Sequence, residues 1–91
     1  MTDPSDRLPT VSLCVPTFNR AQALGRTLES LLRQTFTDFE LVVVDNASSD
    51  DTTNVVRNFR DPRIRYCRNP TNLGLYPNWN RCLDLARGEY V

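Results

Sequence analysis

At 91 residues, the chain can form at most one small domain, because a chain of this length buries only about two thirds of its unfolded surface. Its 11 arginines balance 11 acidic residues, so it lacks the net positive charge that is typical of nucleic-acid-binding domains. The absence of histidine excludes the commonest general base and metal ligand, and no apolar stretch approaches the roughly 18 residues that a membrane span requires.

The first predicted element is a strand over residues 11–15, which follows a polar and acidic start. We expect residues 1–10 to be disordered. Because they lack the apolar core of a signal peptide, we also expect the protein to be cytoplasmic. A helix is predicted over residues 20–34 from leucines spaced three and four apart, with Asn19 as its N-cap and Gln22 completing a capping box.

The β-branched run at residues 40–44 predicts a second strand. Its near-continuous apolar character is typical of a strand buried on both faces of a parallel sheet. A second helix is predicted over residues 51–59, capped by Ser48 or Ser49, and a third strand over residues 64–67. Strands and helices therefore alternate along the chain.

A third helix is predicted after a loop rich in Asn, Pro, Thr and Gly, with Pro77 in its first turn and Gly88 as its C-terminal cap. Its expected core-facing stripe consists of Leu75, Trp79, Cys82, Leu83 and Ala86. Residues 89–91 begin a fourth extended segment. Since Cys14 and Cys67 fall in predicted strands, the three cysteines are expected to be core thiols rather than metal ligands.

This alternation predicts one α/β domain over residues 11–91, a three-layer, Rossmann-like parallel sheet of strand order 3-2-1-4. The fourth strand would be cut off within or just after the last residues given, so we expect the chain to be the front part of a larger domain. Such a fragment would expose a sheet edge, through which it could form a homo-oligomer. Ligands bind beyond the carboxyl ends of such strands, where two polar loops of this sequence fall.

The loop after the first strand, Pro16-Thr17-Phe18-Asn19-Arg20, contains no glycine. Sites for dinucleotides or S-adenosylmethionine usually have a glycine-rich turn there, so this loop disfavours a methyltransferase. Phe18 could instead stack on a base or pack into the core. Arg20 could pair with a phosphate, or it could be a solvated residue of the first helical turn.

The second loop opens on Asp45, and we expect its carboxylate to be exposed at the end of the strand. It could bind a ribose hydroxyl or a base N–H, or simply form a turn or pair with a helix dipole. Asp50 and Asp51 are typical of a first helical turn, and no spacing of residues points to a metal site. A further polar group could bind a sugar or diphosphate, or satisfy the loop backbone: Asn72, Gly74, Asn78 and Asn80.

Three linked segments are together more specific than any single residue: Val-x-x-x-Val-Pro-Thr-Phe-Asn-Arg from Val11, then Leu-Leu-Arg-Gln-Thr-Phe from Leu31, then Phe-Glu-Leu-Val-Val-Val-Asp-Asn-Ala-Ser-Ser-Asp from Phe39. In this combination the chain resembles a family 2 glycosyltransferase of GT-A fold. Asn72-Leu73-Gly74 and the final Ala-Arg-Gly-Glu-Tyr-Val fit the same family, so the resemblance covers nearly the whole chain.

The resemblance implies transfer of a sugar, with inversion, from a nucleotide donor such as a UDP-sugar to an acceptor hydroxyl. It also implies that residues 11–91 form the nucleotide-binding half of the enzyme. The residues it implies for nucleotide binding are Pro16, Thr17, Phe18, Arg20, Asp45, Asn46, Asp50 and Asn78. Those it implies for shaping the loops are Asn19, Ser48, Asn72 and Gly74.

The chain departs from the family in two ways. It has Asn78-Trp79-Asn80 where members often have Ala-Arg-Asn. The family's Asp-x-Asp metal motif and its acidic general base follow the Gly-Glu-Tyr-Val segment and are not within these residues, so we expect no catalytic and no metal-binding residue here. A divalent cation, Mg²⁺ or Mn²⁺, is expected only for the full-length enzyme. The alternative is a non-catalytic nucleotide-binding or self-associating interaction module.

Overall fold

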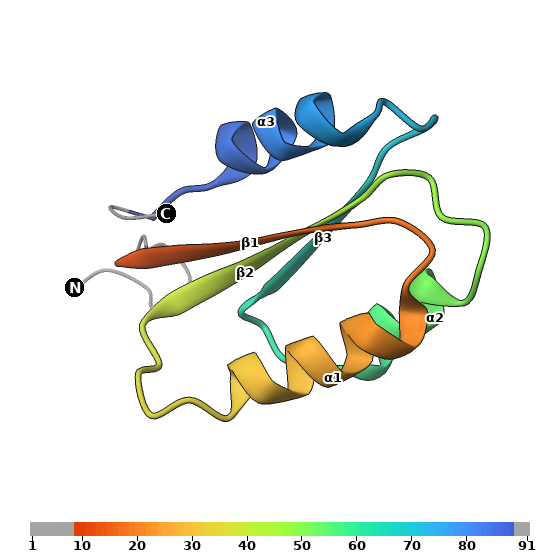
Figure 1. Ribbon diagram of the computed structural model, residues 1–91. Coiled ribbons are helices and arrows are strands. Elements are labelled where there is room, and N and C mark those ends of the chain that lie inside the picture. Colours follow the sequence, from red (N-terminus) through yellow and green to blue (C-terminus); the bar gives the residue numbers. More distant parts are fainter. Residues whose placement is uncertain (1–8, 89–91) are drawn as a thin grey trace.

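The computed structural model describes residues 9–88, in which strands and helices alternate (Figure 1). In chain order the elements are β1 (Val11–Thr17), α1 (Ala21–Leu32), β2 (Phe39–Asp45), α2 (Thr52–Asn58), β3 (Ile64–Arg68) and α3 (Leu75–Leu85). Where bounds were predicted, they differ from these by two residues at most. The predicted fourth strand, residues 89–91, lies outside the described residues. Within residues 9–88, no helix has the length and apolar composition needed to cross a membrane.

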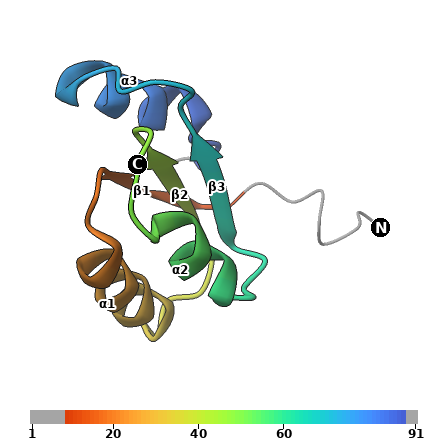
Figure 2. The same ribbon diagram turned by 90° about the vertical axis from the view of Figure 1, so that its right-hand side faces the viewer.

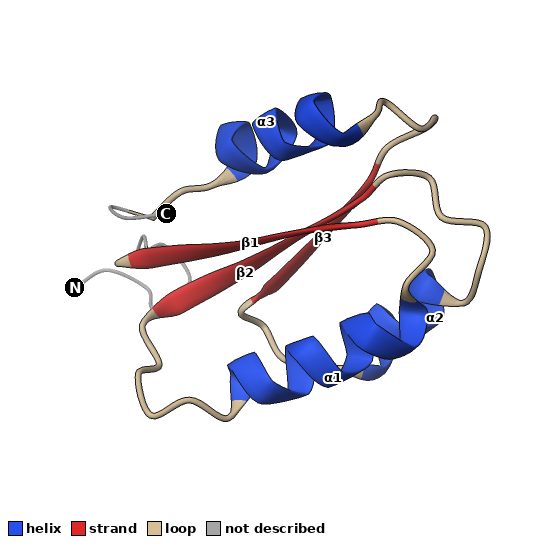
Figure 3. Cartoon of the chain, viewed as in Figure 1, coloured by secondary structure: helices blue, strands red, loops and turns tan. Residues whose placement is uncertain are grey.

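The strands form one parallel sheet in the order β1-β2-β3 (Figure 3). Helices α1 and α2 cover one face and α3 covers the other, as two views at right angles show (Figures 1 and 2). The predicted three-layer α/β architecture is therefore confirmed. Because Thr17 pairs with Asp45 and Asp45 pairs with Arg68, the carboxyl ends of the strands meet at one edge.

Strand β2 is the centre of the fold, and all seven of its residues are buried, as the apolar run predicted. Its side chains alternate between two apolar clusters. The larger cluster, on the side of α1 and α2, has as its buried members Leu24, Leu28, Phe39, Leu41, Val43 and Val56. The smaller, on the side of α3, has Val42, Val44 and Cys82. Since burial of one aliphatic side chain contributes about 1.5–3 kcal/mol, the larger cluster supplies most of the hydrophobic stabilisation.

The face that α3 turns to the sheet differs from the prediction. Of the predicted apolar stripe only Cys82 is buried, whereas Leu75, Trp79 and Leu83 are 64%, 48% and 53% exposed. The other buried residue of the helix is polar: the Asn78 amide donates to the Val44 carbonyl oxygen at 3.3 Å. This hydrogen bond favours a face of α3 that keeps Cys82 against the sheet but leaves Leu75, Trp79 and Leu83 exposed.

Gly88 is not the helix cap that was predicted, because α3 ends at Leu85 and its C-cap residue is Ala86. Its backbone N–H instead donates to Ser12 Oγ of β1 at 2.7 Å. A Cβ atom at Gly88 would lie 2.6 Å from the Ser12 backbone nitrogen, so only glycine fits this close approach. The chain after α3 is therefore held directly against the start of β1.

Glu40 joins the same part of the structure at the amino end of the sheet. Its buried carboxylate accepts hydrogen bonds from Ser12 Oγ at 2.5 Å and the Arg87 backbone N–H at 2.6 Å, and it pairs with the Arg65 and Arg87 guanidinium groups at 2.9 and 3.1 Å. Burial alone would raise the pKa of Glu40, but these four contacts outweigh it and lower that pKa to about 2. One carboxylate thus links all three strands to the end of α3.

Candidate functional site

A cavity of about 560 Å³ lies at the carboxyl edge of the sheet, where the loop after β1 faces the start of α3. It is lined by Pro16, Thr17, Phe18, Arg20, Asn46, Asn72, Gly74, Leu75, Asn78 and Trp79. Parallel sheets place their ligand sites at this edge, and the volume is within the range of small-molecule pockets. The cavity is therefore the candidate site.

Eight of the residues predicted from the sequence line this cavity. Six were predicted to bind the nucleotide, namely Pro16, Thr17, Phe18, Arg20, Asn46 and Asn78, and two to shape the loops, namely Asn72 and Gly74. Leu75 and Trp79 were missed as site residues, although their apolar spacing had been noted, because that spacing was interpreted as a core-facing stripe.

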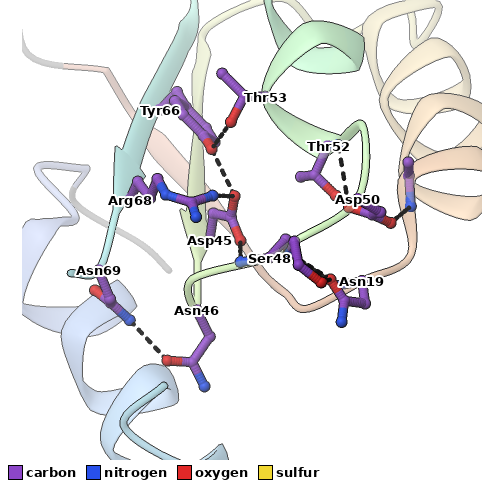
Figure 4. A network of polar contacts seen from close by, with 12 residues as sticks. Asn19, Asp45, Asn46, Ser48, Asp50, Thr52, Thr53, Tyr66, Arg68 and Asn69 are labelled. Atoms are coloured by element: carbon purple, nitrogen blue, oxygen red, sulfur yellow. Dashed lines mark hydrogen bonds and ion pairs between the residues drawn. The ribbon is translucent and has the colours of Figure 1, made fainter. Parts of the chain in front are cut away.

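The floor of the cavity is a cluster of asparagine amides. The Asn46 amide nitrogen donates to Asn72 Oδ1 at 2.7 Å and to the Gly74 carbonyl at 3.3 Å, while its Oδ1 accepts from Asn69 Nδ2 at 3.1 Å. The Asn69 amide also donates to Asn78 Oδ1 at 2.7 Å. Figure 4 shows Asn46 and Asn69 side by side beyond the ends of β2 and β3. These bonds hold the loop after β3 and the first turn of α3 against the sheet.

Asp45 lies beside the cavity rather than in its lining, and the expectation that its carboxylate is exposed is wrong. The residue is 0% exposed. Its Oδ1 accepts from the Ser48 backbone N–H at 2.9 Å, and its Oδ2 accepts from the Tyr66 hydroxyl at 2.6 Å and from Arg68 Nη1 at 3.2 Å (Figure 4). Burial raises the pKa of the Tyr66 hydroxyl, and the hydrogen bond from this hydroxyl to Asp45 raises it further. The hydroxyl therefore stays a proton donor. A nucleotide contact by Asp45 itself stays a prediction.

The predicted capping box at α1 is also wrong. Asn19 has a positive φ of 50°, and the structure places Arg20 at the N-cap position with no side-chain cap. The Asn19 side chain turns outward to the other loop, where its Oδ1 accepts from the Ser49 backbone N–H at 2.7 Å. Sequence spacing suggested a local cap, but the partner comes from a distant part of the chain.

Asp50 supplies the hydrogen bonds that those caps were expected to make. Its Oδ2 accepts from the Ala21 backbone N–H of α1 at 3.1 Å, and its Oδ1 accepts from the Thr52 N–H of α2 at 3.1 Å. The Thr52 hydroxyl hydrogen bond is the main cause that lowers the pKa of Asp50. Because α2 begins at Thr52 with no side-chain cap from its N-cap residue Asp51, the predicted cap by Ser48 or Ser49 is wrong.

The cavity offers three kinds of contact to a ligand. Phe18 and Trp79, 42% and 48% exposed, present aromatic surface. Arg20 supplies a guanidinium group, and the amide cluster supplies hydrogen-bonding groups. Such a set suits a flat heterocycle with an anionic group attached. Within residues 9–88, no cluster of three or more His, Cys, Asp or Glu is arranged to hold a metal ion.

A family model described as Glycosyl transferase family 2 matches residues 12–91. Among curated proteins, GalNAc(5)-diNAcBac-PP-undecaprenol beta-1,3-glucosyltransferase of Campylobacter jejuni is 44% identical over 87 residues, which cover 92% of this chain and 28% of that protein. The chain spans between a quarter and a third of the length of the first curated relatives it matches.

Two solved structures are similar in fold. A mannosyltransferase from Pyrobaculum calidifontis in complex with GDP-Man and Mn²⁺ superimposes with a TM-score of 0.78 at 29% identity, over 89% of this chain and 25% of that one. S. aureus TarS 1-349 in complex with UDP gives a TM-score of 0.74 at 32% identity, over 90% and 26% of the two chains.

Proposed function

The chain belongs to glycosyl transferase family 2, and we propose that it forms the part of the enzyme that binds the nucleotide of a nucleotide-sugar donor, a UDP-sugar. The cavity at the carboxyl edge of the sheet is the observation that carries this proposal, because aromatic, cationic and amide groups converge in it. The two related structures hold GDP-Man and UDP, which are ligands of that chemistry.

The proposed roles follow from the chemistry of the lining. The aromatic surface of Phe18 contacts the base, and the Arg20 guanidinium pairs with the diphosphate. Asn46 and Asn78 lie at the cavity floor and reach the base or ribose through their amides, and Pro16 and Thr17 form the adjoining wall. Asp50 acts from outside the cavity, because it holds the first turn of α1, next to Arg20.

The reaction proposed for the whole enzyme is transfer of the sugar to an acceptor hydroxyl with inversion. The described residues that line the cavity include no Asp or Glu, and we propose that the general base and the ligands for a divalent cation come from another part of the enzyme. A cation such as Mg²⁺ or Mn²⁺, when bound by the whole enzyme, would neutralise charge on the departing diphosphate. What residues 9–88 contribute is binding and orientation of the nucleotide.

Titration of the 91-residue chain with UDP, GDP and uridine tests the proposal. The single tryptophan, Trp79, lines the cavity and reports binding by its fluorescence. We expect UDP or GDP to change this signal, and Arg20→Gln to weaken UDP binding while leaving uridine binding unchanged. Arg57→Gln, on an exposed face of α2, is the matched control. Failure of both diphosphates to bind the parent chain would refute the proposal.

A second candidate function, self-association, is favoured by an apolar groove that adjoins the first cavity and shares Pro16 and Trp79 with it. A cavity of about 620 Å³ runs along β1, lined by Ser12, Leu13, Cys14, Val15, Pro16, Thr27, Leu31, Trp79 and Leu83. Among the described strands β1 pairs only with β2, and in this second candidate function its other edge pairs with a second copy of the chain. Sedimentation velocity should then detect a dimer that Leu83→Asp abolishes and that Phe36→Asp, an equally exposed apolar site elsewhere, leaves intact.

A further inference from the structure

The two loops at the carboxyl edge are held together by a chain of hydrogen bonds that begins at Asp45. Its Oδ1 accepts the Ser48 backbone N–H at 2.9 Å. The Ser48 hydroxyl oxygen in turn accepts the Asn19 backbone N–H at 2.8 Å. Ser48 is 2% exposed, so its bond to Asp45 is buried, whereas its bond from Asn19 is partly buried because Asn19 lies at the surface. In Figure 4, Asp45, Ser48 and Asn19 follow one another from the end of β2 to the loop after β1.

Asn19 is the residue of the β1 loop whose backbone most needs such support. Its φ of 50° lies in the left-handed region, which disfavours a residue with a side chain, though asparagine less than most. The Ser48 hydroxyl fixes its N–H, and the Ser49 N–H donates to its side-chain oxygen at 2.7 Å. The neighbours of Asn19 on either side are Phe18 and Arg20, both in the cavity lining. The second loop therefore sets the direction in which these two side chains leave the first.

We propose that Asp45 is a positioning residue that acts on the cavity through Ser48 and Asn19, by fixing the loop that carries Phe18 and Arg20. Its side chain is 0% exposed and is enclosed by Ser48, Tyr66 and Arg68, so burial leaves the carboxylate no surface toward the cavity. Tyr66 and Arg68 hold the other carboxylate oxygen, which fixes the orientation of the group toward Ser48. This inference rests on the proposed function, since it explains how the nucleotide site is kept in shape.

A pair of hydroxyl deletions tests the proposal. Ser48→Ala removes the link to the β1 loop, while Thr53→Ala removes a hydroxyl that contacts Tyr66 OH at 2.9 Å on the opposite side of Asp45. Each variant loses one hydrogen bond of the same network, so their thermal midpoints should fall to a similar extent. We expect Ser48→Ala to weaken UDP binding by about five- to tenfold and Thr53→Ala by less than about twofold.

The backbone conformation of Asn19 gives a second measurement. Glycine adopts positive φ at no steric cost, whereas alanine does not. Asn19→Gly should therefore bind UDP at least about threefold more tightly than Asn19→Ala. The opposite order would overturn the proposal, as would equal losses of affinity in Ser48→Ala and Thr53→Ala.

Amide NMR spectra without ligand separate this inference from the proposed function. The resonances of Phe18, Asn19 and Arg20 should move in Ser48→Ala and stay in place in Thr53→Ala, whether or not the parent chain binds UDP. If the parent chain binds no nucleotide but these shifts are seen, the proposed function fails and the positioning role stands. Unmoved resonances in Ser48→Ala would refute the positioning role.

Discussion

Replacement of Glu40 by glutamine removes one charge and leaves the shape of the side chain. The carboxylate is 3% exposed and accepts four hydrogen bonds, two of them from guanidinium groups that are 33% and 50% exposed. The amide nitrogen of glutamine cannot accept, so the donors to one of the two oxygens lose their acceptor: either Ser12 Oγ and the Arg87 N–H, or the Arg65 and Arg87 guanidinium groups. Breaking a fully buried pair costs about 3–5 kcal/mol, and the partial exposure of both arginines reduces the expected loss of unfolding free energy to about 2–3 kcal/mol.

The pH dependence of this loss follows from the pKa of Glu40. In the folded state it is about 2, below its ordinary value of 4.5, so the folded state favours the ionised form. The resulting stability is therefore complete above about pH 5 and is lost as the pH falls toward 2. Urea unfolding of the parent and Glu40→Gln, followed by far-ultraviolet circular dichroism, should show a difference that is largest at pH 6 and shrinks by more than half at pH 2.5.

The comparison isolates Glu40 because the other acidic groups are the same in both proteins. Glu29→Gln serves as the matched control, since Glu29 pairs with Arg33 on the surface of α1 and is 52% exposed. The loss of unfolding free energy in Glu29→Gln should be below about 0.5 kcal/mol. Equal stability of parent and Glu40→Gln at pH 6, or a difference that stays constant down to pH 2.5, would refute the reasoning.

Four further substitutions test the structure by urea unfolding. Asp45→Ala leaves the Tyr66 hydroxyl and the Ser48 N–H without their buried acceptor and should cost about 3–4 kcal/mol, and a loss below about 1 kcal/mol would contradict the network. Gly25→Ala should raise the free energy of unfolding by about 0.5–1 kcal/mol, because its Cβ would meet only a Val55 methyl at 3.4 Å and alanine favours a helix. Gly88→Ala should lower the free energy of unfolding, because its Cβ would meet backbone atoms. A change of the same sign in both variants would contradict this reasoning. Leu28→Ala, at 0% exposure in the larger cluster, should cost about 3–4 kcal/mol, and a cost near zero would mean that this cluster is not the core.

The layers of the fold could be predicted from the sequence because they depend on local patterns. The run at residues 40–44 is apolar at every position but the first, and such a run is stable only between two covering layers, which is how β2 lies. Part of the lining of the first cavity could be predicted for the same reason, since Phe18 and Arg20 follow the end of a strand of the sheet. These inferences need only the spacing of apolar residues along the sequence and the rule that ligands bind at the carboxyl edge of a parallel sheet.

The hydrogen-bond partners within the site could not be predicted in the same way. The acceptor for the first turn of α1 is Asp50, 29 residues from the Ala21 N–H that it binds, whereas the expected capping box lay within four residues. Asp45 could be placed at the end of β2, but its burial depends on Tyr66 and Arg68 from β3. Side chains brought together by register between strands leave no signal in the spacing along one strand.

The orientation of α3 shows how polar contacts can override an apolar pattern. Spacing alone favours a helix that buries Leu75, Trp79 and Leu83, yet Asn78 and Cys82 are the residues that face the sheet. The Asn78 amide bonds to the Val44 carbonyl and to Asn69, and a buried amide left without such partners would cost about 1–3 kcal/mol. Satisfying it turns the apolar side of the helix away from the sheet, and that turn brings Trp79 into the wall of the candidate site. The asparagine cluster therefore both closes the floor of the cavity and decides which aromatic side chain a ligand meets there.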